Sequence, residues 1–339
     1  MNPRAGHVPC TLPEAESFLK AHLSAPLFPA AALLLAGLLA PVAASAQANG
    51  KARQRQVEVP GGTIEVTIQG EPASETALLD WVETSARGVA EYLGRFPVPR
   101  VRLAVRIADG RGIGHGVTYG GRAPSIRIQV GHSIEPRAFA NDWVLTHEML
   151  HLGFPDLTSD DSWAEEGLST YAEPLARLRT GTMRPQQVWV DLIEGLPKGL
   201  AGPGDRGLHG TESWGRTYWG GAAFWLLADI RIREQTRNRH GLADALAGIL
   251  DAGGDIRARW PLERALAAGD RALGLTVLAD LYQEQAARPE RVDLSRLWDR
   301  LGIRRQGGRV LYDDRAPLAS IREAITTSGT GGGNAATGR

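Results

Sequence analysis

The stretch that decides the fold is Thr146-His147-Glu148-Met149-Leu150-His151, which has the pattern H-E-x-x-H. It lies in an apolar segment that is typical of a buried helix. An α-helix turns about 100° per residue, so His147 and His151 stand one turn apart on one face. Two imidazoles in this position can bind one Zn²⁺ at roughly 2.0–2.1 Å. Glu148, beside His147, can take a proton from a zinc-activated water without being a ligand itself.

The boundaries of this helix are indicated by its flanking residues. Asn141 is a suitable N-cap, and Gly153 and Pro155 stop the helix at its other end. Buried polar groups need partners, and a metal would supply them for this helix. The helix is therefore predicted to carry a metal site.

A second stretch, Ser162-Trp163-Ala164-Glu165-Glu166-Gly167, offers two adjacent carboxylates for the third ligand position. Ser162 and Glu165 fit an S-x-x-E capping box, which gives Glu165 a structural role. Glu166 is therefore predicted to be the third ligand, with water in the fourth position of one Zn²⁺ per chain. Glu173, seven residues further on, is predicted to hydrogen-bond to one of the ligands.

In this order the motifs resemble those of the gluzincin metallopeptidases, in which W-x-x-E-G follows H-E-x-x-H and its Glu is the third ligand. The runs Glu166 to Glu173, Leu178 to Gly181 and Tyr218 to Gly221 are most similar to the glycyl aminopeptidase family. The resemblance covers about residues 140–240. It implies a zinc peptidase in which Tyr218 lies by the zinc and stabilises the oxyanion. Only 14 residues separate His151 from Glu166, fewer than in typical members, and no PDZ-like region is expected to follow.

The charge balance narrows the class of partner. The chain has 339 residues, of which 43% are hydrophobic, and Lys+Arg and Asp+Glu both number 38. A neutral chain without a basic stripe is not expected to bind nucleic acid or an anionic membrane as its main partner. Cys10 is the only cysteine, so no disulfide is expected. The expected partner is a peptide or protein substrate, and the sequence leaves the oligomeric state open.

Residues 1–46 are interpreted as a signal peptide. The Pro-free apolar centre from Ala30 to Ala40 has the length of a signal core and is too short for a comfortable membrane span. Ala44-Ser45-Ala46 gives a cleavage site before Gln47, so a secreted or periplasmic protein without stable membrane anchoring is predicted. An uncleaved membrane anchor is the alternative.

The remaining chain is predicted to be α+β, with a thermolysin-like arrangement of a small twisted sheet followed by a mostly helical part and zinc in the cleft between them. The predicted subdomains are 47–138, rich in strands, and 139–325, helical and catalytic, followed by a disordered tail at 326–339. Within the segment 57–69, alternation predicts a strand after the Pro60-Gly61-Gly62 turn, and it predicts further strands at 101–107 and 126–130. The segment 112–121 is left as a Gly-rich loop or frayed strand. Helical spacing predicts helices at 74–94, 186–194, 217–235, 242–250, 261–268, 277–286 and 294–301.

Two further histidines, His115 and His209, lie in segments rich in glycine. His115 lies in the Gly-rich segment and is interpreted as a surface residue rather than a ligand. His209 lies in a Gly/Pro-rich connection that is a candidate lid, where it is either a transition-state donor or an exposed loop residue. Neither is included in the predicted site.

The predicted function is that of an exported zinc metallopeptidase with Glu148 as general base. One alternative is a non-catalytic exported module that binds zinc or peptide, but a structural site has no need of the base Glu148. The other is a zinc hydrolase of a non-peptide amide, which the sequence does not separate from a peptidase.

The segment before the zinc helix carries an unusual charge pattern for an aminopeptidase. Gluzincin aminopeptidases commonly place a Glu there to bind the substrate ammonium. From Gly110 to Ile134 this chain has no Asp or Glu, and it has Arg111, Arg122 and Arg127 instead. Acetylation of a substrate N-terminus is therefore predicted not to abolish cleavage.

Overall fold

The structure, a computed structural model, describes residues 52–210, 213–289 and 291–327. The predicted signal peptide at 1–46, and the part of the predicted tail from 328 to 339, lie outside the described residues. Within them, a five-stranded sheet with one helix is followed by a series of helices. The mixed α+β class predicted from the sequence is confirmed.

The sheet is built from strands whose residues alternate between a buried and an exposed face. Its order is β1-β2-β3-β5-β4. Strands β2, β3 and β5 are mutually parallel, and β1 and β4 are antiparallel edge strands. Val66, Leu103 and Ile126 pair across three strands and are buried. The bounds are β1 (Arg53–Val59), β2 (Gly62–Gln69), β3 (Arg100–Ala108), β4 (Ile113–Tyr119) and β5 (Ser125–Gly131).

The strand predicted after the Pro60-Gly61-Gly62 turn is confirmed as β2. The residues before this turn form a further strand, β1, which pairs with β2 as a hairpin. Of the two alternatives for the Gly-rich segment at 112–121, the strand is the one observed: it contains the edge strand β4, which pairs with β5 and has an irregular register between Ile113 and Gly116. Side-chain alternation did not reveal β4, because its glycines provide no apolar pattern.

Helix α1 (Glu75–Leu93) supports the sheet and confirms the helix predicted at 74–94. The Ser74 hydroxyl accepts a hydrogen bond from the Ala77 amide at 3.2 Å, which caps the first turn. Gly94 ends the helix with a φ of 84°, a left-handed conformation that favours glycine. The apolar side of α1 and the buried side chains of β2, β3 and β5 belong to one hydrophobic core.

The helices that follow agree with most of the predicted ranges. None of the helices in the described residues is long and apolar enough to cross a membrane. The bounds are α2 (Pro136–Phe139), α3 (Val144–His151), α4 (Ser162–Arg179), α5 (Pro185–Gly195), α6 (Gly221–Thr236), α7 (Leu242–Asp251), α8 (Leu262–Leu273), α9 (Val277–Gln285), α10 (Leu294–Leu301) and α11 (Ala319–Ile325). Short helical turns η2 (Ser159–Asp161), η3 (Leu196–Gly199) and η4 (Gly215–Gly220), and a hairpin of β6 (Ile303–Gln306) and β7 (Arg309–Tyr312), complete the described residues.

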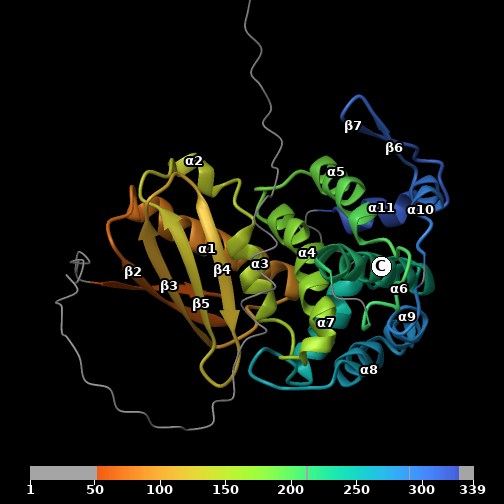
Figure 1. Cartoon of the computed structure of the whole chain (residues 1–339), viewed down its shortest axis with the longest axis horizontal. Coiled ribbons are helices and arrows are strands. Elements are labelled where there is room, and N and C mark those ends of the chain that lie inside the picture. Colours follow the sequence, from red (N-terminus) through yellow and green to blue (C-terminus); the bar gives the residue numbers. More distant parts are fainter. Residues whose placement is uncertain (1–51, 211–212, 290, 328–339) are drawn as a thin grey trace, which may run out of the picture. The chain divides into compact units, whose positions relative to one another are not determined.

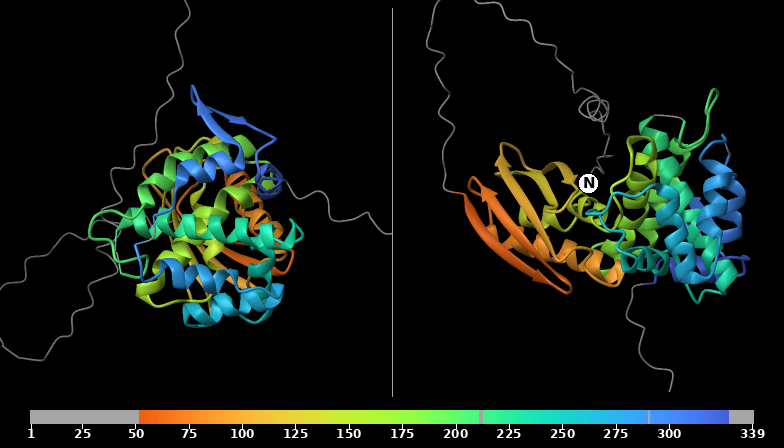
Figure 2. Two further views of the ribbon diagram at one scale, coloured as in Figure 1. Left: turned by 90° about the vertical axis from the view of Figure 1, so that its right-hand side faces the viewer. Right: turned by 90° about the horizontal axis from the view of Figure 1, so that it is seen from below.

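Helices α3 and α4 lie between the sheet and the later helices, as Figure 1 and the right-hand view of Figure 2 show. Helix α3 packs against the edge strand β4 on one side and against α4 on the other. Helix α4 packs in turn against α6, where the buried Trp225 indole donates to the Ala164 carbonyl oxygen at 2.8 Å. The zinc-motif helix is thus enclosed by packed elements, as its apolar sequence predicts.

Candidate metal centre and active site

The three predicted metal ligands come together at the contact between α3 and α4. His147 and His151 project from α3 one turn apart, with ring centroids 5.0 Å from each other. Glu166, in the second turn of α4, places its Oε2 atom 3.1 Å from Nε2 of His147 and 3.6 Å from Nε2 of His151. One potential ligand atom from each residue lies within 4.8 Å of the other two.

The spacing of these atoms fits a zinc ion. Tetrahedral coordination with bonds of roughly 2.0–2.2 Å places neighbouring ligand atoms roughly 3.3–3.6 Å apart. The observed separations of 3.1 and 3.6 Å are close to these values. Two imidazoles and one carboxylate also form the donor set that is typical of a catalytic zinc site with one open position.

The electrostatics of the cluster couple the three side chains. Burial opposes ionisation of Glu166, but the adjacent histidines, His151 first among them, hold its pKa well below the usual range. Burial likewise opposes the charged form of His151, but the carboxylates of Glu166, Glu148 and Glu165 raise its pKa to about 9. The site thus concentrates negative charge around the imidazoles, which favours a bound cation.

The Glu148 carboxylate lies beside the cluster without belonging to it, and strand β4 holds it there. The Thr118 hydroxyl is 2.7 Å from Glu148 Oε2 and 2.8 Å from the Glu148 carbonyl oxygen. Gly116 leaves room for the same side chain, because a Cβ atom on Gly116 would lie 2.7 Å from Cγ of Glu148. The sequence did not indicate these roles of Thr118 and Gly116, because neither residue belongs to a recognisable motif.

Glu165 has a structural partner, but not the one predicted. Its Oε1 atom accepts a hydrogen bond from the Leu157 amide at 2.6 Å, which ties α4 to the preceding loop. The predicted capping box is wrong, because Ser162 is already in the helix and Asp161 occupies the N-cap position. Burial raises the pKa of Glu165 to about 7. Glu165 is outside the ligand cluster, as the sequence analysis expected.

Tyr218 reaches the cluster from η4, a π-helical turn that precedes α6. Its ring is stacked against His147 with a centroid separation of 6.3 Å and an interplanar angle of 22°. Burial, together with the charges of Glu166 and Glu148, raises the pKa of its phenol above the ordinary value. The phenol therefore stays protonated and remains a hydrogen-bond donor at the site.

The structure gives Glu173 a different partner from the predicted metal ligand. Its Oε1 atom accepts a hydrogen bond from the Arg177 guanidinium at 3.1 Å, one turn further along α4, and both side chains are buried. The spacing of seven residues from Glu166 suggested a common face, but Arg177 is closer along the helix and satisfies the carboxylate. Burial raises the pKa of Glu173 to about 7 despite this pairing.

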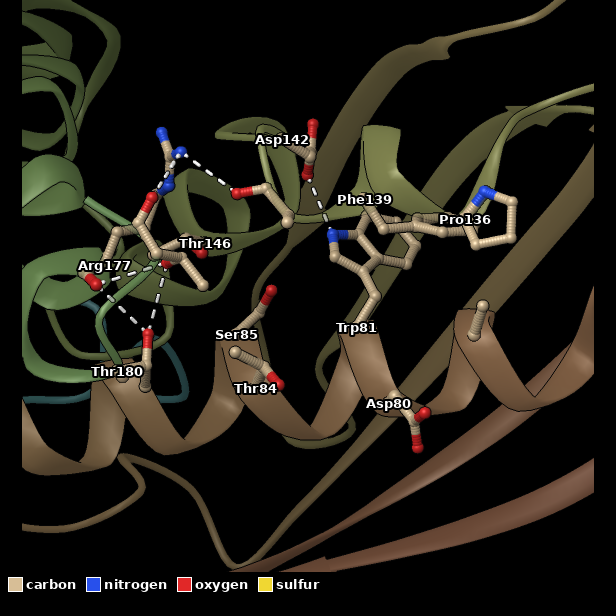
Figure 3. Close-up of a pocket in the computed structure, with 14 residues that line it drawn as sticks. Asp80, Trp81, Thr84, Ser85, Pro136, Phe139, Asp142, Thr146, Arg177 and Thr180 are labelled. Atoms are coloured by element: carbon tan, nitrogen blue, oxygen red, sulfur yellow. Dashed lines mark hydrogen bonds between the residues drawn. The ribbon is translucent and has the colours of Figure 1, made fainter.

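The back of α3 is anchored by Asp142 instead of the predicted cap Asn141. The Asp142 carboxylate accepts from the amides of Val144 and Leu145, each at 3.1 Å, and from the Trp81 indole at 3.1 Å. Figure 3 shows the hydrogen bond between Trp81 and Asp142, which both line a cavity of about 310 Å³ formed by residues of α1, α2, α3 and α4. Asp142 thereby fixes the start of the zinc-motif helix against α1.

His209 lies outside the ligand cluster. His209 Nδ1 is 3.2 Å from Oδ1 of Asp161, and the His209 amide donates to the Ala286 carbonyl oxygen at 2.8 Å. The Gly/Pro-rich connection is thus tied to η2 and to the end of α9. These contacts favour the interpretation of His209 as a loop residue over that of a transition-state donor.

Comparison with known proteins finds likeness at the level of structure. No family model and no curated protein matches the sequence. The fold is similar to that of an aminopeptidase N family protein from Idiomarina loihiensis, with a TM-score of 0.57, 14% identity, and coverage of 75% of this chain and 50% of that chain. An M1 zinc metallopeptidase from Deinococcus radiodurans is also similar, with a TM-score of 0.46, 19% identity, and coverage of 71% and 54%. The chain spans about half the length of these proteins.

The fold is thus similar to that of an aminopeptidase N family protein, and the ligand set that the motifs predicted is brought together in this chain. The similarity to the Idiomarina protein concerns the fold alone. The cluster of His147, His151 and Glu166 is observed in the structure of this chain itself. The finer resemblance to the glycyl aminopeptidase family stays a prediction.

Proposed function

We propose that this chain is an exported zinc-dependent metallopeptidase that hydrolyses peptide bonds. His147, His151 and Glu166 would hold one Zn²⁺ in a thermolysin-like arrangement, with β4 on one side and η4 on the other. The observation that carries the proposal is the position of Glu148. Its carboxylate lies beside three potential ligands, is not one of them, and is oriented by the Thr118 hydroxyl at 2.7 Å.

A zinc ion bound there would polarise the scissile carbonyl and make a water molecule more acidic. Glu148 takes one proton from that water, whose oxygen then bonds to the carbonyl carbon. The carbon–nitrogen bond breaks, and Glu148 delivers the proton to the leaving nitrogen. The Tyr218 phenol donates a hydrogen bond to the negative charge that develops on the carbonyl oxygen.

The variant Glu148→Gln tests the general base. It keeps the shape of the side chain and an oxygen that can accept from Thr118, so zinc content should stay near one per chain. Hydrolysis of a broad peptide library should fall by about 10²-fold or more. Unchanged hydrolysis would remove Glu148 from the mechanism. If the wild-type protein cleaves no peptide of the library, the result would favour one of the two alternatives, a non-catalytic binding module or a hydrolase of a non-peptide amide.

The variant Tyr218→Phe tests the donor to the oxyanion. The ring contact with His147 is preserved, so the expected change is a fall in kcat of about 10²–10³ with little change in KM. A variant that unfolds, or that changes only KM, would assign Tyr218 to packing or substrate binding. Circular dichroism of the variant separates unfolding from loss of function.

Export is proposed from the apolar core and the Ala44-Ser45-Ala46 site of residues 1–46. N-terminal sequencing of the protein recovered from the periplasm or medium of an expressing bacterium should begin at Gln47. A protein that retains residues 1–46 and sediments with membranes would support the uncleaved anchor instead.

A further inference from the structure

Four aromatic rings form a continuous row along the candidate metal site. Trp143 contacts His147 edge-on with a centroid separation of 5.6 Å, and Tyr218 is stacked on the same imidazole. Trp214 is stacked in turn on Tyr218, with centroids 5.9 Å apart and an interplanar angle of 30°. The two tryptophans therefore stand at the two ends of the His147–Tyr218 pair.

The sequence places each tryptophan close to a site residue. Trp143 precedes His147 by four residues at the start of α3, and Trp214 precedes Tyr218 by four residues at the start of η4. Residues four apart in a helix share a face, so both indoles lie on the side that carries the site. Two unrelated elements thus present the same aromatic group beside the same centre.

The two indoles differ in exposure, and both present some aromatic surface to solvent. Trp143 is 44% exposed, more than any other tryptophan of the described residues, and Trp214 is half-buried. A large exposed aromatic surface in a folded protein commonly marks a binding site. The Lys198 ammonium lies 6.0 Å from the centroid of the Trp214 ring, so Trp214 is held between this cation and Tyr218.

We propose that Trp143 and Trp214 determine substrate specificity by selecting peptides with an aromatic or large apolar side chain next to the scissile bond. This inference rests on the proposed function, since it assigns a substrate class to the same site. A Phe side chain in a peptide held between Glu148 and Tyr218 would stack on an indole that otherwise faces water. An Ala side chain is too small to cover it.

The test compares two N-acetylated decapeptides that are identical except for a central Phe or a central Ala. The wild type should cleave the Phe peptide with a kcat/KM at least about tenfold higher than the Ala peptide. Trp143→Leu and Trp214→Leu should each reduce this ratio, and Trp214→Tyr should retain most of it. Tyr312→Leu is the control, because Tyr312 is a similarly exposed aromatic (43%) in the β6–β7 hairpin. Its ratio should equal that of the wild type.

Binding to the zinc-loaded Glu148→Gln protein, measured by tryptophan fluorescence, separates this proposal from the proposed hydrolysis. Tighter binding of the Phe peptide that is lost in the double variants with Trp143→Leu or Trp214→Leu supports the aromatic selection, even if the wild type cleaves neither peptide. Equal binding of the two peptides, or a Phe preference that survives both Trp substitutions, overturns it. If the Leu variants do not fold, equal cleavage and binding of the two peptides by the wild-type and Glu148→Gln proteins still overturns it.

Discussion

Gly167 and Gly221 bring helices α4 and α6 into direct backbone contact. A Cβ atom on Gly167 would lie 2.3 Å from the Cα of Gly221, and one on Gly221 would lie 2.1 Å from the Trp163 carbonyl oxygen. Gly167 follows the ligand Glu166, and Gly221 comes three residues after Tyr218. The close approach of the two helices therefore sets how the ligand and the phenol face each other. This contact gives a physical reason for the Glu-Gly pair in the second motif.

Gly167→Ala should destabilise the fold, because the new methyl group collides with backbone atoms that have no rotamer to relieve it. The free energy of unfolding should fall by about 1–3 kcal/mol, the usual effect of overpacking. Denaturation by urea measures the change. Gly202→Ala is the matched control, since Gly202 has no heavy atom within 4 Å of its Cβ position. Equal stability of the two variants would show that α4 and α6 separate easily.

Gly116→Ala should lower kcat and leave the fold intact. Its methyl group would lie 2.7 Å from Cγ of Glu148 and 3.0 Å from Val144 Cγ1, so the general base must move. A displacement of this kind commonly reduces activity by about 10²-fold. Gly114→Ala on the same strand is the control, because its closest contact is 3.4 Å, to Cβ of Gln129. If both variants retain full activity against the same peptide, β4 does not position Glu148.

The sequence predicted those parts of the fold and site that depend on local pattern. Helices α7, α9 and α10 agree with the predicted ranges because their apolar residues recur at helical spacing, whereas α8 continues to Leu273, beyond its predicted end at 268. The ligand set His147, His151 and Glu166 could be predicted because the H-E-x-x-H and E-G motifs each lie within a short stretch of sequence and can be recognised there.

Contacts between residues distant in sequence were not predictable in the same way. The Thr118 to Glu148 hydrogen bond joins residues thirty positions apart and has no signature in either segment. The partner of Glu173 was missed for a related reason. Helical spacing from Glu166 indicated which face of α4 carries Glu173, but it did not indicate that Arg177 would be the hydrogen-bond partner of Glu173. Asn141 is not the cap because α3 begins later than the pattern suggested: Trp143 is the N-cap residue, and the Asp142 carboxylate accepts from the first amides of the helix.

Glu166→Ala should abolish zinc binding, whereas Glu165→Gln should not. Glu166 contributes one of the three potential ligand atoms, and removal of one ligand from such a site weakens zinc binding strongly. In Glu165→Gln, the amide oxygen can still accept from the Leu157 amide, so the start of α4 should stay in place. Metal analysis after dialysis gives the zinc content of each variant. Full zinc occupancy in Glu166→Ala would move the third ligand elsewhere, with Glu165 the first residue to examine.

Glu173→Gln should change how stability depends on pH. Burial raises the pKa of Glu173 from its ordinary value of 4.5 to about 7, and the nearby Arg177 lowers it only in part, while Asp142 and Asp191 add to the rise. Because the folded-state pKa is the higher one, the stability from the retained proton is full below about pH 4.5 and is lost as the pH rises through about 7.

In Glu173→Gln the titrating group is gone, so the free energy of unfolding should fall less steeply between pH 5 and 7 than in the wild type. Urea denaturation at several pH values measures the two slopes. Glu83→Gln, which changes an exposed carboxylate of α1, should keep the wild-type slope. Identical slopes for the wild type and Glu173→Gln would place the Glu173 carboxylate in an ordinary, ionised state.

The last prediction concerns which peptides the site accepts. An α-ammonium group that enters a desolvated site needs a carboxylate partner, because an unpaired charge is costly there. Strand β4 lies against α3, and neither β4 nor β5 carries an Asp or Glu. The guanidinium group of Arg127, on β5, lies over the Tyr119 ring of β4, 4.9 Å from the ring centroid. The carboxylates of the site itself already have partners, as the contacts of Glu148, Glu165 and Glu166 show.

An ammonium group therefore finds no dedicated acceptor among the described residues of β4 and β5, and a free N-terminus should not be required for cleavage. Matched peptides with free and acetylated N-termini should be cleaved with kcat/KM values within about tenfold of each other, since no charge-paired contact is lost. Mass spectrometry of the products should also show cuts at internal bonds of the acetylated peptide. Cleavage restricted to the free-amine peptides, one residue at a time from the N-terminus, would contradict this and establish an exopeptidase. In that case Glu165→Gln would be the first variant to test for loss of the ammonium contact, because burial holds the pKa of this carboxylate near 7 and a bound cation would stabilise its charge.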